Sequence, residues 1–360
     1  MMTGSSDEPS QNVIPTEGRS GPSGGISAAD NSEFRIPNSE FVSVGVCYNT
    51  PMKTPTSHTC RISIIVTLLI SLTACAQAPA PVDPAYAAEV EEWRSGRLER
   101  LTAADGWLTL TGLFWLEEGE NTFGSAEDNP VVIPDGSVPG VAGQLVIGSD
   151  RVVTAKAGEG AEVYVNGERL TEAQLKTDAT GQPDVITAGR AQFYIIDREG
   201  RLAARVKDPE AATLTAFAGI EHFPISESFR VHARLEAYGE PKEVPVPTVL
   251  GQDALYTAPG ILHFAIDGVE HTLEPYLSGP EGESYFLIFR DATSAVTTYG
   301  AGRFLYASAA DENGATVLDF NLAYNPPCAF TPYATCPLPP PQNWLQLSIE
   351  AGEKYSGEAH

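Results

Sequence analysis

The sequence predicts a mainly β protein, with a β-sandwich or barrel architecture and one N-terminal helix. Helical spacing of apolar residues is clear over residues 85–101, where Val90, Trp93, Leu98 and Leu101 recur among charged residues. Short strand-like runs follow, separated by turn dipeptides of the kind that joins antiparallel strands. Many turn signals with little helix are typical of all-β domains.

The expected strands and turns lie between this helix and the C-terminus. The first strands are expected over residues 107–110, 113–116, 131–133, 144–147 and 163–165. Two-residue hairpin turns are expected at Asn166-Gly167, Glu199-Gly200, Asp267-Gly268 and Asn313-Gly314. Pro, Lys and Glu over residues 240–247 indicate a weak boundary. It separates a helix-containing β region, residues 85–240, from a second β region, residues 248–355.

The composition is that of an acidic globular protein. The chain has 360 residues and 42% hydrophobic content, enough for a sizeable core and one or two domains. It contains 22 Lys and Arg against 47 Asp and Glu, which gives a net charge of -25. Nucleic-acid binding needs a basic face, so we expect no nucleic-acid partner. The acidic surface either keeps the protein soluble or collects cations.

The N-terminal part differs in composition from the rest. Residues 1–51 are rich in Ser, Gly, Pro and Asn, which predicts disorder or an upstream extension of the gene. Residues 52–74 begin at Met52, the expected start, and combine basic residues with a short apolar run over 62–72. That run is too short to span a bilayer comfortably, so the pattern predicts a secretory signal peptide.

The signal peptide ends in Leu72-Thr73-Ala74-Cys75, which resembles the bacterial lipobox. In that motif, cleavage before the cysteine leaves an N-terminal thiol that carries a diacylglycerol lipid, for example with palmitate. We therefore expect a lipoprotein anchored at Cys75, with residues 75–84 as a tether. This implies a membrane partner and a periplasm-facing place in the cell envelope, and Ala76 favours the outer membrane. The alternative is an ordinary signal peptide with an incidental cysteine.

Beyond the leader and the lipidated cysteine, Cys328 and Cys336 remain. An exported protein meets an oxidising compartment, so this pair predicts a disulfide. Structural zinc is the alternative, but it usually takes four N or S ligands, and the chain has no CxxC. His263 and His271 are expected on opposite faces of a hairpin, so we expect no metal. No cofactor is predicted, because GxGxxG, P-loop and HExxH motifs do not occur.

The segment from Asp319 to Leu345 is the first place to look for a site. It combines two cysteines, several prolines and aromatics, and three asparagines. Such a stretch is neither a helix nor an ordinary strand, and a rigid polar loop is where binding residues usually lie.

The expected hairpin at Asn313-Gly314 leads into this segment. A two-residue turn would place Asp319 opposite Ser308 and Asn321 opposite Tyr306, on one polar face. With Arg303 further along the strand, this group could hold a polar ligand. The alternative is a hydrogen-bonded network that supports the loop.

Arg205 and Lys207 share one face of another expected strand, where they could meet an anion; the alternative is an edge strand blunted by charge. The candidate ligand-binding residues are Arg205, Lys207, Asp291, Tyr299, Arg303, Tyr306, Asp319, Asn321, Asn325 and Asn343. No catalytic residue is assigned, because the thiols are expected to be oxidised and no serine lies in a nucleophile elbow. The carboxylates of Asp291, Asp319 and Glu350 could form an acid–base pair.

Residues 107–167 resemble a forkhead-associated β-sandwich. The similar pieces are residues 121–125, 131–134 and 165–167. In that family an arginine after the glycine and a Ser-x-x-His motif bind phosphothreonine. Ser125 stands where the arginine would be, and residues 138–144 contain no histidine. The resemblance therefore implies the fold but not phosphopeptide binding.

Nearly all of residues 91–354 is similar to the bacterial family called domain of unknown function 1684. The matching motifs are residues 106–108 with 112–116, 205–208, 298–300 with 302–303, and 319–342. Residues 350–353 are similar to the family's closing motif, whereas Trp344 replaces its usual arginine. The resemblance implies no activity, because none is assigned to the family.

Together these observations predict a lipid-anchored, all-β envelope protein that binds a polar or anionic small ligand. A hydrolase that uses acidic residues is the second hypothesis, and a structural envelope module is the third.

Overall fold

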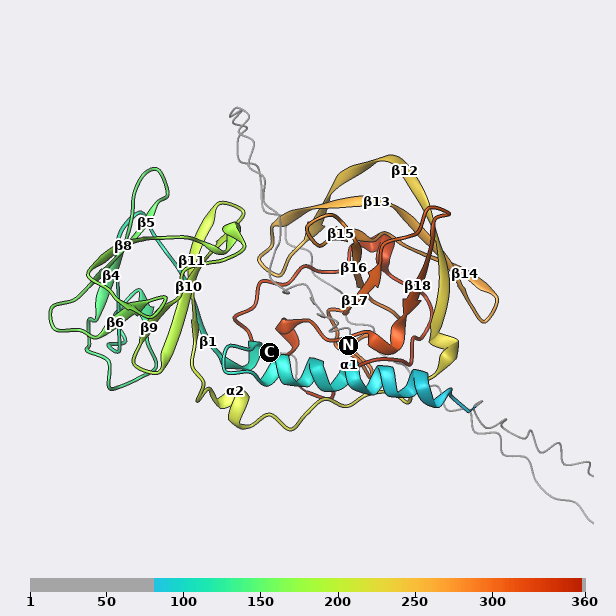
Figure 1. Ribbon diagram of the computed structural model, residues 1–360, viewed down its shortest axis with the longest axis horizontal. Coiled ribbons are helices and arrows are strands. Elements are labelled where there is room, and N and C mark those ends of the chain that lie inside the picture. The colour runs from blue at the N-terminus through green and yellow to red at the C-terminus, as the bar shows by residue number, and fades with distance from the viewer. Residues whose placement is uncertain (1–80, 358–360) are drawn as a thin grey trace, which may run out of the picture. The chain divides into compact units, whose positions relative to one another are not determined.

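The structure, a computed structural model, describes residues 81–357 (Figure 1). The predicted leader, signal peptide and most of the tether, with Cys75, lie outside the described residues. Among the residues that are described, no helix is both long and apolar enough to cross a membrane. The mainly β fold class with one long N-terminal helix is confirmed.

The long helix α1 spans Pro84–Thr102, as the apolar spacing predicted. The side chain of Asp83 caps it by accepting a hydrogen bond from the Ala85 N–H at 2.8 Å, and proline occupies the first turn. The buried face carries Tyr86, Val90, Arg97 and Leu101. This face contacts residues 319–353 near the C-terminus, so α1 covers the second β region rather than the first (Figure 1).

The first β region consists of two sheets that pack face to face. The six-stranded sheet has the order β1-β11-β10-β9-β6-β7, and the five-stranded sheet has the order β3-β2-β4-β5-β8. Their inner faces share one apolar core, in which the rings of Phe123 and Phe193 lie 5.2 Å apart. The strands are β1 Leu110–Trp115, β2 Gly119–Gly124, β3 Val131–Val132, β4 Gly143–Ile147, β5 Val153–Ala157, β6 Val163–Val165, β7 Glu168–Arg169, β8 Glu172–Leu175, β9 Ile186–Ala188, β10 Ala191–Arg198 and β11 Arg201–Lys207.

The second β region also has two sheets, one of four strands in the order β14-β13-β12-β18 and one of three in the order β15-β16-β17. Both contribute to one core, where Phe320 packs against Phe264 and Phe289. The strands are β12 Arg230–Pro247, β13 Asp253–Ile266, β14 Val269–Leu273, β15 Tyr276–Ser278, β16 Ser284–Phe289, β17 Arg303–Ser308 and β18 Ala315–Asp319.

Short helices connect these elements. They are η1 Trp107–Thr109, η2 Asp178–Thr180, α2 Ala212–Thr215, η3 Glu227–Phe229, η4 Phe320–Leu322, η5 Pro327–Ala329 and η6 Pro341–Asn343. The last three lie in the segment that the sequence singled out, which is therefore a series of single turns, as its prolines favour.

Three of the four predicted hairpin turns are confirmed. Asn166-Gly167, Glu199-Gly200 and Asp267-Gly268 all have positive φ at both turn residues, which a two-residue type I′ turn requires. The last of these pairs His263 with Thr272 and His271 with Phe264, so the two histidines do alternate in facing, as predicted.

The fourth turn differs, and the difference moves the candidate residues. At Asn313-Gly314 only Gly314 has positive φ, and its N–H donates to Asp311 O at 2.8 Å. The Asp311 carboxylate accepts hydrogen bonds from the N–H groups of Asn313 and Ala315, which stabilises a longer turn. The two-residue turn was therefore wrong: β17 pairs with β16, β18 pairs with β12, and Asp319 lies opposite Arg230.

Two further differences are local. Residues 107–109 were predicted to be extended, but they form a 3₁₀ turn because the Thr109 hydroxyl donates to Gly106 O at 2.7 Å. Strand β12 continues through residues 240–247, where the sequence indicated a boundary. The irregularity in its pairing with β13 falls just before, between Ala237 and Lys242.

Candidate functional site

Three of the ten predicted residues form a buried scaffold in the second β region. Arg303 and Asn343 are fully buried, and Asp291 is nearly so. Asn343 donates from Nδ2 to the carbonyls of Glu274 and Ile288 at 3.0 Å, and its Oδ1 accepts from the Glu274 N–H at 2.8 Å. Every polar atom of this amide is therefore used to join backbone segments.

Arg303 also joins separate backbone segments, but it does so with a charged side chain. Its Nη2 donates to Asp291 Oδ1 at 3.1 Å and to Ile349 O at 2.9 Å, and its Nη1 donates to Ala351 O. Asp291 Oδ2 accepts from the Ile349 N–H at 2.7 Å. Burial lowers the pKa of Arg303, and Asp291 opposes this effect. The ion pair thus holds the C-terminal segment against β17, away from solvent.

Asn325 joins the segment from Asp319 to Leu345 to helix α1. Its N–H donates to Glu353 Oε2 at 2.7 Å, and its carbonyl accepts from Arg97 Nη2 at 3.0 Å. Arg97 Nε also contacts Glu353 Oε1 at 3.2 Å, and both side chains are buried. Gly352 allows this approach, since its φ is +77° and a Cβ there would lie 2.3 Å from Ala323 O. Sequence reasoning missed the Arg97–Glu353 pair.

Arg205 and Lys207 flank one ring, as the alternation predicted. Their charged groups lie 6.0 and 5.4 Å from the centroid of Tyr194. The alternative of an edge strand was wrong, because β11 is hydrogen-bonded to β1 on one side and β10 on the other. Lys207 donates to Asp105 O, whereas Arg205 is 2% exposed and donates from Nη2 to Thr335 Oγ1 at 3.2 Å.

Thr335 lies in residues 328–336, the cysteine loop, which begins and ends at the two cysteines. The structure therefore brings Arg205 to that loop. The predicted disulfide is not supported, because Cys328 and Cys336 are free thiols in the structure. They are nevertheless in contact, since the Cys328 N–H donates to Cys336 Sγ at 3.2 Å. Tyr299, another predicted residue, donates from its hydroxyl to Cys328 O at 3.1 Å.

Of the remaining predicted residues, Tyr306 and Asp319 line a groove between α1 and strands β17 and β18, and Asn321 is buried beneath it. The cavity has a volume of about 240 Å³, and Tyr306, Asp319, Tyr86, Arg230 and Glu89 are among the residues that line it. The hairpin register was wrong, but it correctly put Tyr306 and Asp319 near one another. Tyr86 and Arg230, which complete the groove, come from α1 and β12 and were missed.

The groove is built around the carboxylate of Asp319. The Tyr86 hydroxyl lies 2.9 and 2.8 Å from its two oxygens and donates to them. Asn321 supports both groups, because its Nδ2 lies 2.8 Å from the Tyr86 hydroxyl and 3.0 Å from Asp319 Oδ1. Burial, and then the hydrogen bond to Asp319, raise the pKa of Tyr86 well above its usual range. Tyr86 therefore remains a neutral donor.

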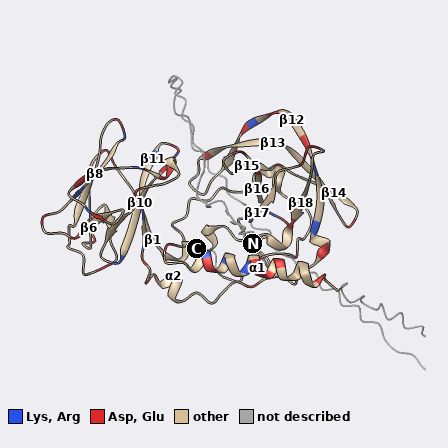
Figure 2. Ribbon diagram, viewed as in Figure 1, with Lys and Arg blue, Asp and Glu red and all other residues tan. Residues whose placement is uncertain are grey.

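One cation and one exposed ring complete the groove. The Arg230 guanidinium lies 4.8 Å from the Tyr86 ring centroid, and its Nε is 3.9 Å from Asp319 Oδ2. Nearly half of the Arg230 side chain is exposed. Tyr306 is 39% exposed and stacks on Phe286 at 5.0 Å. Charged residues of both signs also occur along the neighbouring α1 (Figure 2). The groove thus offers acceptors, a donor cation and a flat apolar surface.

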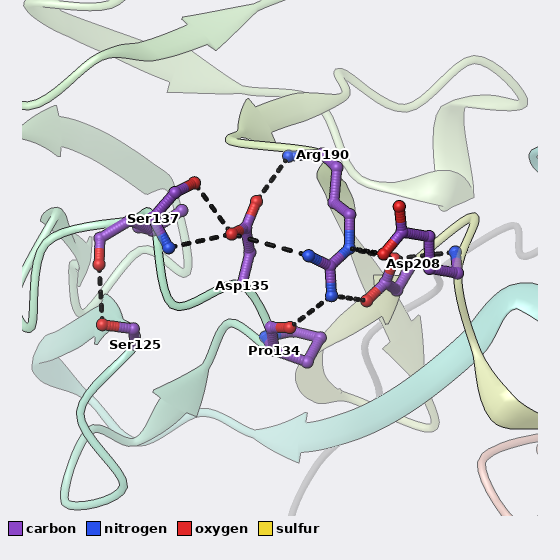
Figure 3. Close-up of polar contacts among 8 residues, drawn as sticks. Ser125, Pro134, Asp135, Ser137, Arg190 and Asp208 are labelled. Carbon is purple, nitrogen blue, oxygen red and sulfur yellow. Dashed lines mark hydrogen bonds and ion pairs between the residues drawn. The ribbon is translucent and has the colours of Figure 1, made fainter.

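A second polar cluster, in the first β region, has no counterpart in the sequence predictions (Figure 3). Arg190 donates from Nε and Nη2 to the two oxygens of Asp208 at 2.9 Å, and its Nη1 lies 3.6 Å from Asp135. Hydrogen bonds from the Arg190 and Ser137 N–H groups lower the pKa of Asp135 to about 2. Ser125 donates its hydroxyl to Val138 O at 2.7 Å. This cluster ties the loops of the sandwich together.

Within residues 81–357, no group of three or more His, Cys, Asp or Glu side chains is placed to hold a metal ion. Two of the carboxylates that were considered as an acid–base pair lie in different environments. Asp291 is buried against Arg303, whereas Asp319 faces the groove.

Residues 215–354 match the family described as Protein of unknown function (DUF1684). This part of the chain, residues 215–354, therefore belongs to the DUF1684 family. The match covers the groove strands β12, β17 and β18, and the cysteine loop, but not Arg205 or α1. The comparison with curated proteins gives no match.

Solved structures similar to this chain include an uncharacterized protein of Haloarcula marismortui. It is 31% identical, and the alignment covers 40% of this chain and 80% of that chain with a TM-score of 0.35. Forkhead-associated domains are also found. The FhaA domain complexed with the intracellular domain of Rv3910 is 20% identical over 26% of this chain and 97% of that chain, with a TM-score of 0.19. The FHA-2 domain of the Mycobacterium tuberculosis ABC transporter Rv1747 is 27% identical over 25% and 77%, with a TM-score of 0.20.

Proposed function

We propose that this DUF1684 protein is a lipid-anchored protein of the bacterial cell envelope that binds a small polar, anionic ligand in the groove between α1, β17 and β18. The observation that carries this proposal is the meeting of Asp319, Arg230 and Tyr306 at one cavity of about 240 Å³. Most of the predicted residues use their polar atoms inside the protein, whereas the side chains of Asp319, Tyr306 and Arg230 line an open cavity.

The lining selects a ligand class. Arg230 is held by Asp319 only at 3.9 Å and is half exposed, so its guanidinium is available to an anionic group. Asp319 and Glu89 accept hydrogen bonds from hydroxyl groups, and the exposed face of Tyr306 covers an apolar ring face. The volume lies slightly below that of typical drug-sized sites, which favours a ligand the size of one sugar acid.

The anchoring part of the proposal rests on the lipobox-like residues 72–75 and on where the fold begins. Helix α1 starts at Pro84 and is capped by the side chain of Asp83, eight residues after Cys75. The Ala/Pro-rich residues between Cys75 and this cap suit a short tether to a lipid.

The binding proposal is tested by calorimetry and thermal shift with residues 81–357 and a panel of sugar acids, each matched to its neutral sugar. We expect glucuronate-type compounds to raise the melting temperature and glucose-type compounds to have little effect. Arg230→Met abolishes that difference, while Arg234→Met, on the same strand but outside the groove lining, leaves it intact. If no compound shifts the melting temperature, the structural-module hypothesis is favoured instead. Turnover of a glycoside or ester that depends on Asp319 would favour the hydrolase.

A further inference from the structure

The two thiols of the cysteine loop are in contact but unequal. The Cys328 N–H donates to Cys336 Sγ at 3.2 Å, so the two residues are held together without a covalent bond. Cys328 is half-buried, whereas Cys336 is 6% exposed. A hydrogen bond from the Cys336 thiol lowers the pKa of Cys328, and burial raises the pKa of Cys336 well above its usual range. One thiol is therefore accessible and readily ionised, and the other is covered and neutral.

A buried cation faces this pair. Arg205 is 2% exposed, and within residues 81–357 it forms no ion pair with a carboxylate. Its Nη2 donates to Thr335 Oγ1, next to Cys336 in the chain, and its Nε is buried without a hydrogen-bond partner. Its positive charge favours the thiolate of both cysteines. Burying a guanidinium without an opposite charge costs free energy. The Cys328 thiolate would supply this opposite charge.

This charge balance distinguishes the two redox states of the pair. A disulfide is neutral and would leave Arg205 unpaired, whereas the dithiol with Cys328 ionised pairs it. Arg205 therefore stabilises the reduced state, which makes the pair a better oxidant once it is oxidised. A purely structural disulfide needs the opposite arrangement, because it must resist reduction.

The backbone around Cys328 is held in one conformation. The Tyr299 hydroxyl donates to Cys328 O at 3.1 Å, and Cys328 lies in the 3₁₀ turn η5 that begins at Pro327. The Thr331 N–H closes the next turn on Pro327 O at 3.1 Å. The half-buried sulfur is thus presented by a fixed turn rather than by a mobile chain.

We propose that Cys328 and Cys336 form a thiol–disulfide exchange pair that reacts with thiols and disulfides of other proteins, with Cys328 as the sulfur that bonds to the partner, Cys336 as the resolving thiol and Arg205 as a positioning residue. The proposal is independent of the groove, and it does not rest on the ligand proposed for it.

The reaction balances with a partner disulfide as the oxidant. The Cys328 thiolate attacks one sulfur of the partner, a new S–S bond forms, the partner's S–S bond breaks, and the displaced sulfur takes a proton from water. Cys336 then gives its proton to solvent and attacks Cys328 Sγ. This forms the intramolecular disulfide and releases the partner's second thiol. In this direction the pair is oxidised by two electrons, and the partner disulfide is reduced. The exchange is reversible, and its reverse, in which the Cys328–Cys336 disulfide oxidises two partner thiols to a disulfide, is the direction that the charge of Arg205 favours.

The first test measures alkylation of the reduced protein by iodoacetamide between pH 5 and about 10, with mass spectrometry to locate the label. We expect Cys328 to react first, with an apparent pKa below the usual value of about 8.5 for a thiol. The titratable and charged groups that face the pair are Arg205, Tyr299 and Tyr256, with Arg198 beyond Thr335. Of these, the tyrosines remain neutral because burial raises their pKa values.

Arg198 provides a matched control for Arg205. It also donates to Thr335 Oγ1 at 3.2 Å, but Asp178 neutralises it at 2.7 Å. Arg205→Met should raise the apparent pKa of Cys328 and slow its alkylation near pH 7 several-fold, whereas Arg198→Met should change it little. Equal effects of the two variants would overturn the role of Arg205.

The second test needs no arginine variant and uses glutathione disulfide as the probe. Cys336→Ser should accumulate a mixed disulfide of Cys328 with glutathione, and Cys328→Ser should not. In glutathione buffers the wild-type pair should populate both redox states. A pair that stays fully oxidised at every glutathione ratio is a structural disulfide, and that outcome, or label on Cys336 alone, overturns the proposal.

Discussion

The two β regions each contain an Arg–Asp pair that joins distant segments, but the pairs differ in their access to water. Arg303 and Asp291 in the second region have fully buried side chains. Arg190 in the first region has a side chain that is 37% exposed, although its partner Asp208 is buried. The groove pair, Arg230 and Asp319, is the most open, with 47% of the arginine side chain exposed and a separation of 3.9 Å. The same chemistry therefore serves three purposes: a closed scaffold, a loop tie and an available ligand contact.

The largest effect is expected from Asp291→Asn. This change leaves Arg303 buried without its ion-pair partner, and it removes one acceptor from the Ile349 N–H. Breaking a buried pair on one side costs about 3–5 kcal/mol of the free energy of unfolding. Urea denaturation of residues 81–357 measures it. A loss below about 1 kcal/mol would show that the buried pair is not the scaffold we infer.

The matched change in the first region, Asp208→Asn, is expected to cost less than half as much in the same urea experiment. Arg190 keeps contact with water, with Asp135 and with Glu210, so it is not left uncompensated. An equal or greater loss of stability than with Asp291→Asn would contradict the comparison.

Asp135 makes the stability of the first region depend on pH in the acid range. The folded-state pKa of this residue is lowered from 3.8 to about 2, chiefly by hydrogen bonds from the N–H groups of Arg190 and Ser137. A lowered pKa contributes stability above pH 4, and this contribution is lost as the pH falls from about 4 to 2. Asp135→Asn should therefore flatten the stability curve in that window. Melting temperatures at pH 2, 3, 4 and 7 check it, and an unchanged slope would contradict it.

The smallest effect on stability is expected from Arg230→Met. An exposed ion pair at this distance contributes about 0–1 kcal/mol, so the urea midpoint should hardly move. A loss of ligand response without a loss of stability would sharpen the distinction between the groove and the scaffold. A large loss of stability would instead place Arg230 among the structural arginines.

Local signals predicted much of the fold. Asn166-Gly167, Glu199-Gly200 and Asp267-Gly268 were predictable because a type I′ turn is determined by two adjacent residues with positive φ. The fourth turn was not, because the carboxylate of Asp311, just outside the dipeptide, accepts hydrogen bonds from the N–H groups of Asn313 and Ala315. Helix α1 was predictable from spacing alone.

The candidate site was less predictable, because its partners are far apart in the chain. Asp319 and Asn321 were recognised as polar residues at a strand end, but Tyr86, which bonds to both, lies more than 200 residues earlier. Its helical position and aromatic ring gave no polar signal. Arg97 and Glu353 are separated in the same way. By contrast Arg205 and Lys207 were correctly placed on one face, since strand alternation is a local property.

Helix α1 has a consequence for the order of folding events. It is the first element of the described chain to be synthesised, yet its contacts through Tyr86 and Arg97 reach residues 233 and 256 positions later. Most of the stability of a helix in a protein comes from tertiary packing of one face, so α1 depends largely on that late surface. Its buried face therefore stays exposed to solvent during synthesis until nearly the whole chain has been made. In hydrogen exchange its amides should open before the sheet cores do, and docking of this helix should be the last step to native structure.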